Sequence, residues 1–171
     1  RIWVATGDLD HESTLWATDD GFATLTPQLN LGQRTRTTDI RCEPDALLWG
    51  TDSPLEPSWI VRWDRATGEV RHERELPGPA YYFASNAAGG VYLGTTVEPG
   101  PAVQDRIARI YGRRRDGSWR ELVRLPRGFW PQFGIVHLPR GVLPGAWLAF
   151  TPRAVGPHEG GLVLARDRGW S

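Results

Sequence analysis

The sequence predicts an all-β fold, a β-propeller fragment of about three to four four-stranded antiparallel blades. Two observations lead to this prediction. The 171 residues include 20 Gly, 14 Pro and 9 Trp and carry no sustained 3.6-residue apolar period, which favours short strands and turns over helices. In addition, Trp-Gly-Thr at residues 49–51 is echoed by Leu-Gly-Thr at residues 93–95, and the two segments continue alike.

Repetition organises the chain as one predicted domain, a partial propeller over residues 1–171. An equivalent apolar strand recurs at spacings of 45, 44 and 55 residues, counted from Ile2 through Leu47 and Val91 to Ala146. Propeller blades repeat at about 40 to 50 residues. A β-sandwich or an irregular β-solenoid is the alternative architecture. The predicted units span about residues 1–29, 30–76, 77–125 and 126–171.

Strands and turns alternate within each unit. Asp20-Gly21 and Asp116-Gly117 are hairpin signals, because both residue types tolerate positive φ. The first unit lacks its first strand and the fourth lacks most of its last, so we expect a piece of a longer chain, with the missing blades supplied by that chain or by another protomer. Strands are expected at residues 1–7, 14–18 and 23–26, then 38–43, 47–51, 59–64 and 69–76, then 81–85, 91–95, 106–113 and 119–125, and finally 132–138, 146–151 and 161–166.

Two turns resemble those of known propeller families. Residues 111–119, Tyr-Gly-Arg-Arg-Arg-Asp-Gly-Ser-Trp, resemble the Asp-box hairpin of sialidase-like propellers, with Asp116, Gly117 and Trp119 retained but Arg114 at the Ser position. Residues 63–70 are similar to the Asp-x-x-Thr-Gly turn of quinoprotein-like and lyase-type propellers. The sialidase resemblance implies a six-bladed enzyme or lectin with an Arg cluster, a Tyr/Glu nucleophile pair and an Asp acid. No residues of this chain can be matched to those roles.

Because neighbouring strands are antiparallel, the loop after the second strand of each unit and the connection from one unit to the next emerge at the same end of the sheets. This end is here called the mouth. These loops, residues 7–13, 52–57, 96–105 and 152–160, hold eight of the twenty acids but only one Arg. The alternative interpretation is that the acids are merely solvated loop residues. The predicted ligand-binding residues are the following acids and aromatics of the mouth: Asp8, Asp10, Asp52, Glu56, Glu98, Asp105, Glu159, Tyr81, Tyr82 and Trp130.

The acidic, aromatic mouth predicts a ligand-binding propeller that takes a small polar ligand, with carbohydrate binding or glycan processing as the specific expectation. Clustered carboxylates raise one another's pKa and can supply acid and base groups. Asp52 and Glu98 are the leading pair, since each follows a strand that ends in Thr. If the protein is an enzyme, a glycoside hydrolase is expected. The alternative is a protein-interaction or structural propeller without catalysis.

The overall charge and the absence of known motifs limit the kinds of partner that we expect. Twenty Arg and twenty acidic residues cancel, so neither nucleic acid nor a membrane is an expected partner, and no metal-ligand or cofactor motif occurs. The compartment is not predicted. Cys42 is the single cysteine and is expected to be a buried apolar side chain. Four aromatic residues at equivalent strand positions are expected to pack between blades: Trp3, Trp49, Tyr92 and Trp147.

Overall fold

The computed structural model describes residues 1–128 and 133–168, and their regular elements are all β-strands. No helix in this part of the chain is long and apolar enough to cross a membrane. The all-β prediction is therefore confirmed. The strands are β1 (Ile2–Thr6), β2 (Thr14–Thr18), β3 (Thr26–Asn30), β4 (Ile40–Cys42), β5 (Ala46–Gly50), β6 (Ser58–Asp64), β7 (Val70–Leu76), β8 (Ala80–Asn86), β9 (Val91–Val97), β10 (Ile107–Arg113), β11 (Trp119–Pro126), β12 (Gly134–His137), β13 (Val142–Leu143), β14 (Trp147–Arg153) and β15 (Val163–Arg166).

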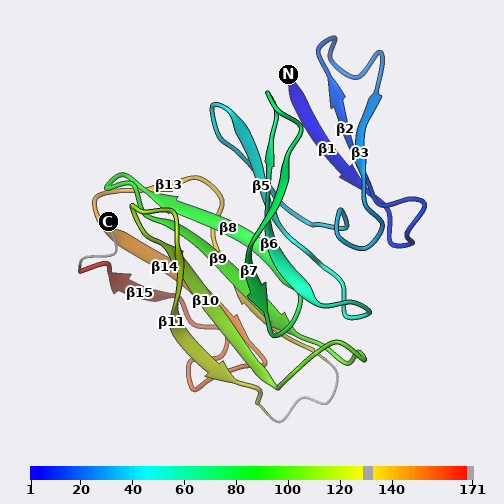
Figure 1. The fold of residues 1–171 in the computed structure, drawn as a ribbon. Coiled ribbons are helices and arrows are strands. Elements are labelled where there is room, and N and C mark those ends of the chain that lie inside the picture. The colour runs from blue at the N-terminus through cyan, green and yellow to red at the C-terminus, as the bar shows by residue number, and fades with distance from the viewer. Residues whose placement is uncertain (129–132, 169–171) are drawn as a thin grey trace.

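Consecutive strands pair into antiparallel sheets (Figure 1). The first sheet has the order β1-β2-β3 and the second β4-β5-β6-β7. The third is an eight-stranded, curled sheet in which β8, β9, β10 and β11 pair in sequence and β12, β14 and β15 follow. Its two parts are joined because β12 pairs with the end of β9, Ile135 opposite Thr96. The short β13 pairs in parallel with β8, a contact that the sequence pattern did not predict.

Aspartate side chains close the predicted turns. Asp64 Oδ1 accepts hydrogen bonds from the backbone amides of Ala66 (2.9 Å) and Thr67 (2.8 Å), and Gly68 follows at φ 76°. Such side-chain bonds to nearby amides mimic a backbone turn, and glycine accepts the positive φ without a steric cost. The residues that predicted this turn from the sequence therefore also form it in the structure.

The core consists of two layers between successive sheets and a third layer inside the curl of the eight-stranded sheet. Along β5, Leu47 and Trp49 face the first sheet, while Ala46 and Leu48 face β8–β11. Because side chains alternate along a strand, one fully buried strand supplies two apolar layers. A third layer fills the space between β8–β11 and the strands β12, β14 and β15, with Tyr92 of β9 among its residues.

The repeated Gly-Thr has a structural reason at both positions. A Cβ at Gly50 would lie 2.6 Å from Ala80 Cβ of β8, and one at Gly94 would lie 2.8 Å from the Val136 carbonyl oxygen of β12, so each glycine lets a later strand approach closely. The threonines that follow are buried, and their hydroxyls accept backbone hydrogen bonds: Thr51 from Trp59 at 2.8 Å and Thr95 from Arg109 at 2.7 Å. The repeat therefore allows close packing against a later strand at both positions, β8 in the next sheet and β12 in the same sheet.

Two expectations about individual side chains are wrong. Cys42 is exposed, because it ends the three-residue edge strand β4 rather than facing a core layer. Trp147 is 42% exposed because it lies on the outer face of the β12-β14-β15 group, whereas Trp49 and Tyr92 are buried as expected. Trp3 is partly buried against the layer between the first two sheets.

Candidate ligand-binding site

Backbone hydrogen bonds hold the mouth segments of neighbouring sheets together. The Asp52 amide donates to the Arg36 carbonyl (2.8 Å), the Ala80 amide to the Thr51 carbonyl (2.9 Å), and the Thr96 amide to the Pro79 carbonyl (2.8 Å). The segment that precedes the second sheet is thereby bonded to the loop after β5. The end of β5 is in turn bonded to the start of β8 in the third sheet. Side chains from three consecutive sheets are brought to one place.

Asp52 is the most buried acid in this place. It is 6% exposed, and its Oδ1 atom has no hydrogen-bond partner among the described residues. Burial raises the pKa of the Asp52 carboxyl to about 7; Arg36 lowers it, and the charges of Glu98 and Asp8 raise it further. At neutral pH this carboxyl is therefore divided between its protonated and ionised forms.

Arg36 supplies the positive charge beside Asp52. Its Nη2 atom lies 3.4 Å from Asp8 Oδ1, and its Nη1 donates a 3.5 Å hydrogen bond to the Asp8 carbonyl. The Nε atom is buried without a hydrogen-bond partner in the described part of the chain. Thus a buried donor and a buried acceptor, Arg36 Nε and Asp52 Oδ1, each have bonding capacity left.

Tyr81 forms the aromatic side of the same place. Burial raises the pKa of its hydroxyl well above the ordinary value, and the charges of Asp52 and Glu98 add to the increase. Its ring meets the Tyr82 ring edge-on at 5.7 Å and lies 6.1 Å from the Phe133 ring. Tyr81 at β8 therefore presents a neutral phenol next to the acids, with two further rings behind it.

Glu98 reaches the place from the loop after β9. Thr96 Oγ1 donates a 3.0 Å hydrogen bond to Glu98 Oε1, which orients the carboxylate. The loop packs on the loop after β5: the Ala102 amide donates to the Pro54 carbonyl at 3.0 Å, and a Cβ at Gly100 would lie 2.3 Å from Pro54 Cβ. We call Asp8, Arg36, Asp52, Tyr81 and Glu98 the Asp52 cluster.

The other residues predicted for the mouth lie outside this cluster. Asp10 Oδ1 accepts a 2.7 Å hydrogen bond from Gln33 Nε2 and so supports the loop before β2. Tyr82 stacks on His137 at 5.6 Å. Glu56 and Glu159 are exposed loop residues. Trp130 lies outside the described residues.

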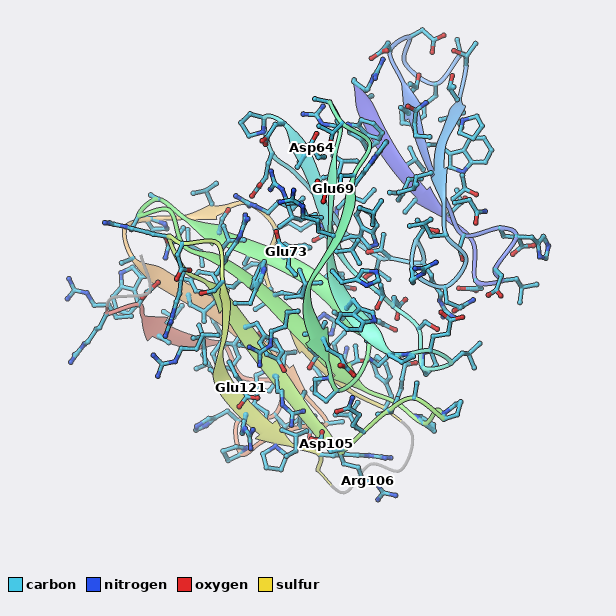
Figure 2. The ribbon with its side chains drawn as sticks, in the orientation of Figure 1. Asp64, Glu69, Glu73, Asp105, Arg106 and Glu121 are labelled. Atoms are coloured by element: carbon cyan, nitrogen blue, oxygen red, sulfur yellow. The ribbon has the colours of Figure 1, made fainter. Side chains whose placement is uncertain are left out.

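Asp105 belongs to a different charged group. It pairs with Arg109, whose side chain is 5% exposed and whose Nε lies 2.9 Å from Glu121 Oε2. The hydrogen bond from Arg109 holds the pKa of Asp105 below its ordinary value. Figure 2 shows Asp105 and Arg106 at the mouth end of the sheets and Asp64 at the opposite end. The carboxylate of Asp105 is committed to a structural ion pair.

Sequence reasoning missed Arg36 and Phe133. Residues 31–39 precede a very short strand and contain several Arg and Thr residues without a period, so nothing in the pattern distinguishes Arg36 from Arg34. Phe133 carries no motif. Its place beside Tyr81 depends on the pairing of β12 with β9, a contact between distant strands.

Among the described residues, no group of three or more His, Cys, Asp and Glu side chains is placed to hold a metal ion. The Asp52 cluster accordingly offers hydrogen bonds, charge and ring faces. No protein-family model, curated protein or solved structure matches this chain.

Proposed function

We propose that this chain forms part of a β-propeller and that the Asp52 cluster, at the mouth, binds a small polar ligand, most specifically a glycan. The architecture is supported by the two four-stranded meanders, β4–β7 and β8–β11, stacked face to face in chain order. The same register irregularity occurs in the pairs β2–β3, β6–β7 and β10–β11. Radial repetition of such sheets is what defines a propeller.

Neighbouring blades are proposed to cover the outer sheet faces. Ala149 and Leu164 are directly paired, so Trp147 and Leu164 share the face opposite the buried Leu148 and Phe150. Leu164 is 61% exposed and Trp147 42% exposed. An apolar sheet face of this kind is normally buried against another layer. The blades would come from the rest of a longer chain or from another protomer.

The observation that carries the ligand proposal is the unpaired buried carboxylate oxygen of Asp52. A buried polar atom without a partner is costly, whereas a ligand hydroxyl could donate to it. Arg36 Nε offers a complementary donor, and the ring of Tyr81 offers a stacking face. Carbohydrates present both hydroxyls and apolar ring faces, which fits this combination.

Glycoside hydrolysis is a second candidate function for the same cluster. Hydrolases of this class pair a carboxyl group of raised pKa with a second carboxylate. Asp52 has the raised pKa, and Glu98 is close enough for its charge to contribute to that shift. In this proposal Asp52 donates the proton to the leaving oxygen, and Glu98 acts as the base or nucleophile.

An array of immobilised mono- to tetrasaccharides tests the binding proposal, followed by calorimetric titration of any glycan retained. We expect Asp52→Asn and Glu98→Gln to weaken binding by about tenfold or more, since each removes a charged hydrogen-bond partner. Glu56→Gln, on the same loop as Asp52 but outside the cluster, should leave affinity unchanged. Retention of no glycan, or equal losses in Asp52→Asn and Glu56→Gln, would refute the proposal.

Hydrolysis is tested separately with a panel of p-nitrophenyl glycosides. Release of nitrophenol by the wild type but not by Asp52→Asn would support the second candidate. Binding without release would limit the cluster to recognition.

A further inference from the structure

A pocket lies at the end of the sheets opposite the mouth. It has a volume of about 380 Å³ and lies between β4, the turn from β8 to β9 and the turn from β10 to β11. Antiparallel order places these turns together, away from the Asp52 cluster. The pocket is lined by Arg41, Glu43, Ala88, Gly89, Val91, Arg113, Arg114, Arg115 and Gly117.

The lining carries four arginines against one acid, Glu43. That acid is already engaged on both oxygens: Arg62 Nη1 lies 2.6 Å from Oε2, and Arg113 Nη1 lies 2.7 Å from Oε1. Arg41 Nε, which is buried and makes no hydrogen bond to the described residues, lies 3.7 Å from Oε1 of Glu43. Glu43 therefore contacts three guanidinium groups, although Arg62 is also paired with Asp45 and Arg113 with Glu73. The excess of positive charge among the lining residues is carried chiefly by Arg114 and Arg115.

Arg113 is held in place before any ligand arrives. Besides Glu43, its Nη2 lies 3.4 Å from Glu73 Oε1, and its guanidinium lies 6.0 Å from the centre of the Trp119 ring. Trp119 is itself fixed, since Nε1 donates a 2.6 Å hydrogen bond to Glu73 Oε2. A charged group so fixed loses little conformational entropy on binding.

Arg114 and Arg115 lie exposed on the turn that resembles an Asp-box. The acid of this turn, Asp116, accepts hydrogen bonds at Oδ1 from the Ser118 amide (2.8 Å) and hydroxyl (2.6 Å). The hydrogen bonds from Ser118, together with the charge of Arg114, lower the pKa of Asp116. Asp116 itself does not line the pocket. The turn thus presents two exposed arginines at the rim of a pocket whose inner arginine, Arg113, is held by Glu43 and Glu73.

We propose that this pocket binds a small phosphorylated ligand. Guanidinium groups match the geometry of phosphate oxygens and form paired, charge-assisted hydrogen bonds with them. The pocket volume falls in the range of small-molecule sites. Arg41 and Arg113 form the inner wall, and Arg114 and Arg115 close over the phosphate. The proposal uses none of the residues of the Asp52 cluster and stands independently of the function proposed for that cluster.

Calorimetric titration with sodium pyrophosphate at low ionic strength tests the inference. We expect saturable binding of one pyrophosphate per chain, and a loss of affinity of about tenfold or more in Arg114→Gln/Arg115→Gln, because the variant lacks both charged donors on the turn. Sodium acetate, which carries one charge and no phosphoryl group, should not bind measurably.

The matched control is Arg71→Gln/Arg124→Gln, which removes two exposed charges outside the pocket and leaves the same net charge. This variant and Asp52→Asn should bind pyrophosphate as the wild type does, with thermal midpoints confirming that all variants fold. Absence of saturable binding would overturn the proposal. Equal losses in the two double variants would also overturn it, since they would show that only the overall charge matters.

Discussion

The Asp52 amide donates a 2.8 Å hydrogen bond to the carbonyl of Arg36, so the residues that carry the buried carboxyl group and the neighbouring positive charge are joined through their backbones. Replacing either side chain therefore leaves the link between the two segments intact. This permits side-chain chemistry to be tested at the site without dismantling the loops that carry it.

Asp52→Asn should change how stability depends on pH. The folded pKa of about 7 lies above the ordinary aspartate pKa of 3.8, so the folded state binds more protons between these values. The free energy of unfolding of the wild type should fall as pH rises through this window and level off above it. Asparagine cannot ionise, and the variant should be the more stable at pH 8, by up to about 4 kcal/mol.

Urea unfolding at pH 5 and pH 8 measures the effect as the difference between wild type and variant, which cancels other titrating groups. Glu56→Gln is the control and should show no such window. An unchanged difference at the two pH values would show that Asp52 is ionised throughout.

Gly50→Ala and Gly94→Ala should each destabilise the protein by about 1 to 3 kcal/mol, the usual effect of overpacking. The added methyl groups would meet Ala80 Cβ and the Val136 carbonyl oxygen at less than 3 Å. Gly78→Ala is the matched control, because its Cβ would make ordinary contacts at 3.5 Å and 3.6 Å. Thermal unfolding ranks the three variants, and equal losses would mean that close approach is not the reason for the glycines.

Arg109→Ala should cost about 3 kcal/mol or more, because it leaves carboxylates without the buried cation that they share. Arg109 has a side chain 5% exposed and bridges Asp105 and Glu121. Arg124 contacts the same Glu121 from an exposed position, 62% of its side chain being accessible. Arg124→Ala should therefore have a much smaller effect in urea unfolding, and similar effects would contradict a structural role specific to Arg109.

Cys42 should react with a thiol reagent such as dithiobis-nitrobenzoate in the folded protein, since its side chain is exposed. One equivalent of thiol is expected without denaturant, at a rate close to that in urea. Reaction only after unfolding would restore the original expectation of a buried cysteine.

The sequence was sufficient to predict strands and turns where local chemistry decides them. Asp-Gly and Thr-Gly pairs mark positive φ, and alternation marks the strand faces. Asp52 and Glu98 could be grouped in advance because equivalent positions in successive antiparallel units emerge at the same end. Their proximity in the structure follows from that order.

What the sequence could not reveal depends on contacts between distant segments. The place of Arg36 is set by an irregular segment, and that of Phe133 by the pairing of β12 with β9. Trp147 was expected to be buried like Trp49, but it is the first residue of β14 and lies on an uncovered outer face. Position within a unit predicts which way a side chain points, but not whether a neighbour covers it. Ligand identity stays a prediction.

The layered core has a consequence for how the protein opens. The sheet β4–β7 contributes to two apolar layers, whereas β1–β3 contributes to one. Stacked units of this kind behave as a chain of nearest-neighbour interactions, in which an end unit detaches at the expense of one interface and an inner unit only by breaking two. Amide protons of β2 should therefore exchange with solvent deuterium sooner than those of β5, and local opening should begin at the first sheet.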